Sequence, residues 1–80
     1  MEKSDILLTV QEIFRNILDN EGIVLSEETT ANDVEEWDSL THIQLIVAIE
    51  KKLKIKFNSK EILSWKNVGE MMDSIYSKSN

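Results

Sequence analysis

Apolar residues recur along this chain at steps of three and four, and this spacing constrains the fold more than any other feature. Near the start they are Ile6, Leu7, Val10, Ile13, Phe14, Ile17 and Leu18. A period of about 3.6 residues places them on one side of a helix, which predicts an amphipathic helix over residues 4–20. The chain has no proline and only two glycines to interrupt helices. We expect Ser4 to cap this helix and Gly22 to end it through a left-handed turn.

The same period returns in the middle of the chain after a stretch that lacks it. Residues 23–38 are rich in serine, threonine, asparagine and acids, which predicts a long loop of a kind that is often functional. We expect four apolar residues to pin this loop to the core: Ile23, Val24, Leu25 and Val34. Asp38 is a suitable N-cap for a second helix, with Ser39 at its first position and an end near Leu53.

Two capping signals organise the remainder of the chain. Residues 55–57 alternate in polarity but have no partner strand, so we expect an extended link. Asn58 followed by Glu61 predicts a capping box for a short helix over residues 59–64. Asn67 followed by Glu70 predicts the start of a last helix. The sequence therefore predicts an all-α fold, a small bundle of three main helices and one short helix, in a single domain over residues 1–80.

The composition argues against several classes of protein. The net charge of −6 would be repelled by the phosphates of nucleic acid. The chain has no cysteine and one histidine, so we expect no disulfide and no metal site of the usual kind. No apolar run approaches the roughly 20 residues that cross a bilayer, and the first residues do not resemble a signal peptide. We expect a cytoplasmic protein without membrane insertion, and a monomer by default.

The charges are distributed unevenly between the two parts of the chain. Residues 1–38 hold eleven acids, one lysine and one arginine, a net charge of −9, whereas residues 39–80 hold four acids and seven lysines, a net charge of +3. An acidic zone of this kind attracts basic partners. A solvated surface that aids solubility is the alternative, and the charge pattern alone does not choose between them.

Ser39 is the residue best placed for chemistry. At the start of a helix its hydroxyl lies near unpaired N–H groups and the positive end of the helix dipole, where a phosphate ester is favoured. A serine that only begins a helix is the alternative. His42 lies three positions further on, but an oriented triad and an oxyanion hole are lacking, so we do not predict an enzyme. We expect Trp37 to pack on His42 or Ile43; an exposed anchor for a partner is the alternative.

Residues 38–50 read Asp-Ser-Leu-Thr-His-Ile-Gln-Leu-Ile-Val-Ala-Ile-Glu. This segment resembles the Asp-Ser-Leu helix of the acyl carrier proteins, and the order of helices and loop resembles that family over nearly the whole chain. The resemblance implies that Ser39 carries 4′-phosphopantetheine, added from coenzyme A by a phosphopantetheinyl transferase. The thiol of this group would hold an acyl chain as a thioester. The protein would then be a carrier and not an enzyme.

The resemblance also implies a surface for partners, which would be acyl-activating, acyl-transfer or condensing enzymes. The residues expected on or near that surface are Asp38, Leu40, Ile43, Val47, Glu35 and Glu36. The resemblance further suggests that an acyl chain is sequestered between helices. The cavity expected for it is lined by Phe14, Ile43, Val47, Ile62 and Met72.

Three departures from the fatty-acid carriers bear on the pathway. Glu36-Trp37 replaces a glycine and a small residue, Phe57-Asn58 replaces a common proline, and the second helix carries fewer acids. Acidic contacts should therefore shift to Glu35, Glu36 and Asp38. We expect a specialised carrier, for a polyketide, peptide or modified-sugar pathway, with fatty acid biosynthesis still open. The alternatives are an aminoacyl or peptidyl carrier and an unmodified helical interaction module.

Overall fold

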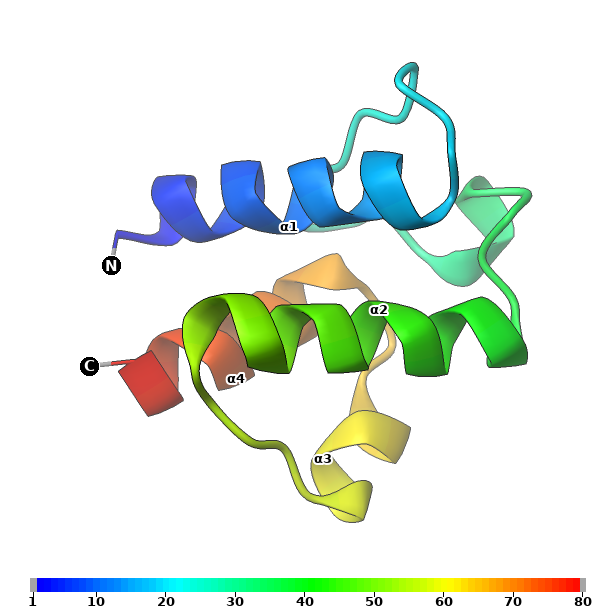
Figure 1. Cartoon of the computed structure of the whole chain (residues 1–80). Coiled ribbons are helices and arrows are strands. Elements are labelled where there is room, and N and C mark those ends of the chain that lie inside the picture. The colour runs from blue at the N-terminus through cyan, green and yellow to red at the C-terminus, as the bar shows by residue number, and fades with distance from the viewer. Residues whose placement is uncertain (1, 80) are drawn as a thin grey trace.

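Four α-helices and one short 3₁₀ helix make up the regular structure of residues 2–79, the part of the chain that the computed structural model describes (Figure 1). In chain order they are α1 (Lys3–Ile17), η1 (Ala31–Asp33), α2 (Ser39–Leu53), α3 (Ser59–Ser64) and α4 (Val68–Ser79). Residues 2–79 contain no strand, so the predicted all-α bundle of three main helices and one short helix is confirmed. None of these helices is long and apolar enough to span a membrane.

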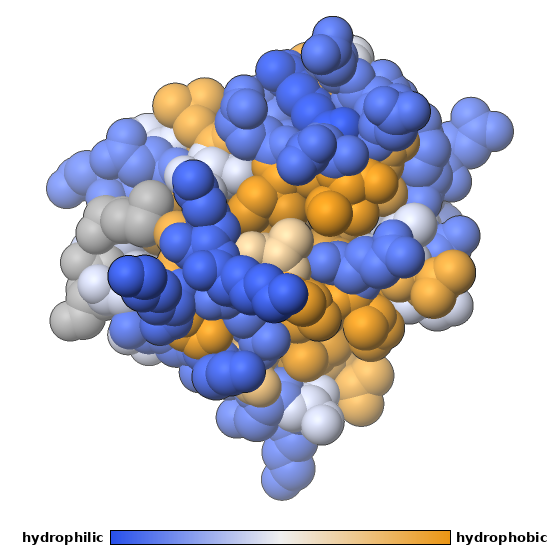
Figure 2. All heavy atoms as spheres, viewed as in Figure 1, coloured by the Kyte–Doolittle hydropathy of each residue, from blue (hydrophilic) through white to orange (hydrophobic). Residues whose placement is uncertain are grey.

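The core forms where α1 packs against both α2 and α4 (Figure 1). Its fully buried side chains come from these three helices: Ile6, Val10, Phe14, Leu45, Ile49, Val68, Met71 and Ile75. In α1 and α4 they are residues that the spacing of three and four predicted, because that spacing puts one stripe of a helix inside. In α2 the prediction was wrong in part: Ile46 and Ile49 are buried as expected, but Leu40, Ile43 and Val47 are exposed and Leu45 is buried. Figure 2, taken from the side on which α2 lies in front, shows that hydrophobic residues also reach the surface between hydrophilic ones.

The predicted ends of α1 were wrong. The N-cap is Glu2, and Ser4 lies inside the helix. At the other end α1 stops at Ile17, and Asp19 rather than Gly22 takes the left-handed conformation, with φ of 52°. The N–H of Asn20 donates to the carbonyl of Arg15 (3.0 Å), which closes the helix end. Aspartate reaches this conformation more readily than most residues, because its short polar side chain bonds locally.

The loop between α1 and α2 is held to the core by three of the four predicted residues. Ile23, Leu25 and Val34 are buried, but Val24 is 75 % exposed, so its predicted role was wrong. Successive side chains of an extended segment point in opposite directions, and Val24 lies between two that point inward. The Gln11 side chain accepts the N–H of Leu25 (2.9 Å) and secures this segment to α1.

The predicted capping signals begin α3 and α4. Asn58 and Glu61 form both halves of a capping box, and α3 has the predicted bounds. At α4 the Asn67 side chain accepts the N–H of Glu70 (3.0 Å) as expected. The N–H of Gly69 donates to the carbonyl of Glu27 in the loop (2.8 Å). This close approach favours glycine, because a Cβ there would lie in tight contact with that carbonyl oxygen, 3.0 Å away.

Candidate functional site

The start of α2 is held by a reciprocal cap. The Asp38 carboxylate accepts the N–H groups of Leu40 (3.0 Å) and Thr41 (2.9 Å). The Thr41 hydroxyl in turn accepts the N–H of Asp38 (2.8 Å). Asp38 is therefore the N-cap and Ser39 the first residue of the helix, both as predicted. The hydrogen bonds between Asp38 and Thr41 fix the backbone on either side of Ser39.

The Ser39 side chain is free to react. The residue is exposed, and within residues 2–79 its hydroxyl has no hydrogen-bond partner. The positive end of the α2 dipole lies at this residue, and it favours a negatively charged phosphate. An exposed, unbonded hydroxyl beside that helix end fits attachment of a phosphate ester without displacing another contact.

The cap also holds the Asp38 carboxyl in its charged form. Hydrogen bonds from Thr41, first from its backbone and then from its side chain, lower the pKa of Asp38. Because the pKa is lower in the folded chain than in the unfolded chain, this stabilisation is present above the unfolded value. It is lost as the pH falls through the lowered pKa.

We expect Asp38→Ala to lower the thermal unfolding temperature at neutral pH, because two N–H groups at the start of α2 lose their acceptor. The difference from wild type should shrink as the pH falls through the lowered pKa of Asp38. Circular dichroism melting curves from neutral pH to about pH 3 test this. Asp5→Ala is the control, since Asp5 is an exposed carboxylate without a side-chain hydrogen bond. A difference that stays constant over this range would contradict the assignment.

Trp37 packs inside the domain and does not serve as an exposed anchor. It is 8 % exposed, and its ring meets the edge of Phe14 with centroids 4.9 Å apart. Its indole N–H donates to Nδ1 of His42 (3.0 Å), and the two rings stack. The predicted packing of Trp37 on His42 is confirmed, and the alternative of an exposed anchor is wrong.

The Trp37–His42 pair is part of an aromatic ladder that the sequence reasoning missed. The ladder runs through consecutive ring contacts in the order Phe14, Trp37, His42, Trp65 and Phe57. The indole N–H of Trp65 donates to the Ser74 hydroxyl of α4 (2.9 Å). The ladder therefore connects α1, the long loop and α2 to the segments that flank α3. Trp37 and His42 are close in sequence, but nothing in the spacing points to Trp65.

The residues predicted to meet partners lie on or beside one side of α2. Leu40, Ile43 and Val47 follow one another at one-turn steps and are 68, 55 and 42 % exposed. Asp38 and Glu35 are also exposed. Glu36 differs, because it is half-buried and its carboxylate accepts a hydrogen bond from the Asn20 amide (2.8 Å). Three exposed apolar side chains, the exposed acid Glu35 and the capping carboxylate of Asp38 thus lie on or beside this side of α2.

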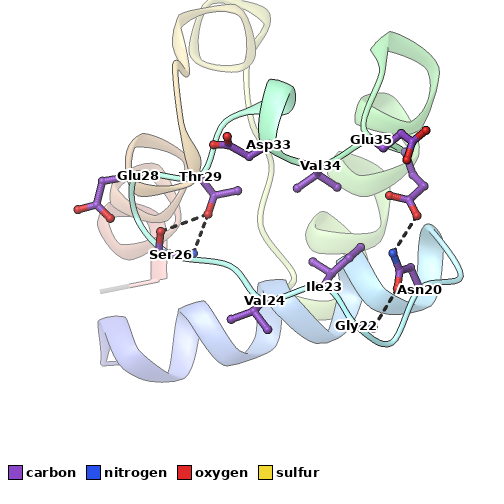
Figure 3. A pocket seen from close by; sticks show the side chains of 11 residues that line it. Asn20, Gly22, Ile23, Val24, Ser26, Glu28, Thr29, Asp33, Val34 and Glu35 are labelled. Atoms are coloured by element: carbon purple, nitrogen blue, oxygen red, sulfur yellow. Dashed lines mark hydrogen bonds between the residues drawn. The ribbon is translucent and has the colours of Figure 1, made fainter.

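Two open hollows lie on the surface, and neither includes Ser39 or the exposed apolar residues of α2. One, of about 420 Å³, lies against the long loop and includes Thr29, Asp33 and the two acids Glu35 and Glu36 (Figure 3). The other lies on the outer side of α1 around Leu8 and Arg15. Neither includes the residues expected to line an acyl cavity, of which Phe14 and Met72 are buried in the core. Within residues 2–79, no group of acids and histidine is arranged to hold a metal ion.

The chain matches the family model for the phosphopantetheine attachment site over residues 9–75. It therefore belongs to that family of carrier proteins. The fold is similar to the solution NMR structure of a holo acyl carrier protein from Geobacter metallireducens. The two share 46 % identity over 90 % of this chain and 83 % of that one, with a TM-score of 0.85. No curated protein matches the chain at a comparable level of significance.

Membership of this family defines the cofactor and the type of activity. The chain carries a covalently attached 4′-phosphopantetheine, and within that class it has the fold of an acyl carrier protein. It carries substrates and does not catalyse their reactions. These conclusions confirm the resemblance that was drawn from residues 38–50.

Proposed function

We propose that this chain carries acyl intermediates as thioesters on a 4′-phosphopantetheine group attached to Ser39. The observation that supports Ser39 is its exposed, unbonded hydroxyl at the first position of α2. The attached group supplies a thiol, which this cysteine-free chain does not contain. The chain's own contribution is to present the hydroxyl at a fixed point and to stabilise the phosphate next to it with the α2 dipole.

We propose that partner enzymes meet the exposed side of α2 beside Ser39. The partners are the phosphopantetheinyl transferase and the acyl-activating, acyl-transfer or condensing enzymes. The exposed apolar residues Leu40, Ile43 and Val47 offer surface that a partner can bury. The exposed acids Glu35 and Asp38 offer charges to a basic partner. Glu36 contributes less than expected from the sequence, because it is half-buried where its carboxylate accepts a bond from the Asn20 amide.

We expect Ile43→Ser to reduce kcat/KM for phosphopantetheine transfer by roughly fivefold, which is about 1 kcal/mol of lost contact. Ile43 is 55 % exposed, so its replacement should leave the unfolding midpoint almost unchanged. Leu8→Ser is the matched control, because Leu8 is 60 % exposed on α1, outside the α2 side chains that follow Ser39. Equal rates for the two variants would show that α2 is not the contact surface.

The pathway is proposed from the departures noted in the sequence. A tryptophan before the Asp-Ser-Leu motif and the lysines at the end of α2 favour a specialised biosynthetic pathway over fatty acid synthesis. We propose that residues 1–80 act as one carrier domain, since the described helices share a single core. We also propose that this domain is monomeric and cytoplasmic. An aminoacyl or peptidyl carrier has the same requirements at Ser39. Loading assays with acyl-activating and aminoacyl-activating enzymes separate these two cargoes.

The first test is modification of the purified chain with coenzyme A, magnesium and a promiscuous phosphopantetheinyl transferase. Intact mass spectrometry should show a gain of one phosphopantetheine group. If the folded chain gains nothing with this transferase or with a second one, the unmodified helical interaction module becomes the better account.

A further inference from the structure

We propose that His42 is a positioning residue whose hydrogen bond from Trp37 holds the backbone ahead of Ser39 for modification, and that protonation of His42 loosens it. The inference rests on the proposed function, because the reaction that it affects is attachment at Ser39. It assigns a role to the one histidine of the chain, which the proposed function leaves without one.

The Trp37–His42 bond spans the residue to be modified. Trp37 lies two positions before Ser39 and His42 three positions after it. The indole Nε1–H donates to Nδ1 of His42 at 3.0 Å, and the rings stack with centroids 5.9 Å apart. The other side of Trp37 meets the fully buried Phe14. The bond therefore connects the first turn of α2 to the core through the segment that leads into Ser39.

The other restraints on this segment do not depend on His42. The Thr41 hydroxyl donates to the Glu36 carbonyl (2.9 Å) and accepts the N–H of Asp38 (2.8 Å). The Glu36 carboxylate accepts from the Asn20 amide (2.8 Å). These contacts keep the segment folded when the Trp37 bond is lost. We therefore expect protonation of His42 to loosen the approach to Ser39 without unfolding α2.

Only neutral His42 can accept the indole proton. Its proton must then be on Nε2, because Nδ1 is the acceptor. In the protonated ring both nitrogens are donors, so two N–H groups face each other and the bond is lost. Trp37 from the loop and Trp65 from the connection between α3 and α4 contact the ring, and neither titrates. The charged residues next to these two tryptophans in the chain are Glu36, Asp38 and Lys66.

Burial supports the neutral form of His42. Loss of solvation is what lowers the pKa of His42 below its usual 6.5, and no charged neighbour contributes to the shift. A folded pKa below the unfolded pKa means that the stabilisation is present above the unfolded value and is lost as the pH falls through the folded one. The loosening is therefore expected on the acid side of about pH 6.5.

The test compares wild type with His42→Asn over about pH 5 to 8. The side-chain oxygen of asparagine stands near the place of Nδ1, so this variant keeps an acceptor that does not titrate. The ratio of the two kcat/KM values for phosphopantetheine transfer cancels the pH dependence of the transferase itself. We expect the kcat/KM of wild type divided by that of His42→Asn to be near one at about pH 8. At about pH 5 this ratio should fall by roughly three- to tenfold, since small misplacements of a reacting group are costly.

Trp37→Phe is a second variant that keeps a ring and removes the donor. We expect this variant to be modified more slowly than wild type. Its kcat/KM divided by that of His42→Asn should not vary with pH. In addition, the NMR resonance of the Trp37 indole proton should move with the same midpoint as the His42 ring. In His42→Asn that resonance should stay constant over the same range.

If the kcat/KM of wild type divided by that of His42→Asn does not change with pH, the positioning role is overturned. The positioning role is also overturned if the chemical shift of the Trp37 indole proton does not change as His42 titrates. A wild-type chain that gains no phosphopantetheine even at about pH 8 has a different meaning. That outcome overturns the proposed function, and this inference falls with it.

Discussion

Replacing Ser39 with alanine is expected to abolish attachment of phosphopantetheine and to leave the fold intact. The hydroxyl is the only group that the substitution removes, and it makes no hydrogen bond within residues 2–79. The residue is exposed, and alanine is a good helix former, so the free energy of unfolding should change by less than about 0.5 kcal/mol. If the cofactor is attached at Ser39, removal of this one exposed hydroxyl should abolish all carrier activity.

The matched control for Ser39→Ala is Ser59→Ala. Ser59 is also an exposed serine at the first position of a helix, directly after a capping residue, Asn58. Intact mass after treatment with a transferase and coenzyme A should show one added group in wild type and Ser59→Ala, and none in Ser39→Ala. Modification that persists in Ser39→Ala would place the attachment elsewhere. If Ser39 only begins a helix and carries no group, Ser39→Ala and Ser59→Ala should give the same result by intact mass.

Phe14→Ala is expected to destabilise the domain by about 3–5 kcal/mol, the cost of removing a large buried ring. Phe14 is fully buried in α1 and forms the inner end of the aromatic ladder, against Trp37. Domains of this kind have a total stability of about 5–15 kcal/mol, and small ones lie at the lower end. The variant should therefore be unfolded in a large fraction of molecules or have a much lower unfolding midpoint.

Urea unfolding followed by circular dichroism measures the loss at Phe14. Phe57→Ala is the control, because it deletes the same ring at the outer end of the ladder, where the side chain is only half-buried. We expect a clearly smaller loss at Phe57. A loss at Phe57 as large as that at Phe14 would show that the ladder, and not burial in the helical core, dominates the stability of these rings.

Local patterns in the sequence determined most of the helical architecture. The spacing of apolar residues predicted which side of α1 and of α4 is buried, because that spacing is a property of the helix itself. It did not separate the buried from the exposed side of α2, where Leu40, Ile43 and Val47 have the same spacing and are exposed. Asp38 and Asn58 predicted the starts of α2 and α3, since a cap needs only residues within one turn. The ends of α1 were predicted less well. Several neighbouring residues can end a helix at similar cost, and Asp19 rather than Gly22 takes the left-handed conformation.

The proposed attachment site also follows from local sequence, because Asp38, Ser39 and Leu40 are consecutive and lie at one helix start. The surroundings of that site depended on the tertiary structure. Glu36 is half-buried where it accepts a bond from Asn20 at the end of α1, and Val24 points outward because its neighbours are buried. His42 meets Trp65 from a segment more than a helix away. Contacts of this kind arise only when packing brings distant residues together. The sequence alone therefore determined most of the helices and the place of the serine proposed for attachment, and the fold determined what holds that serine in place.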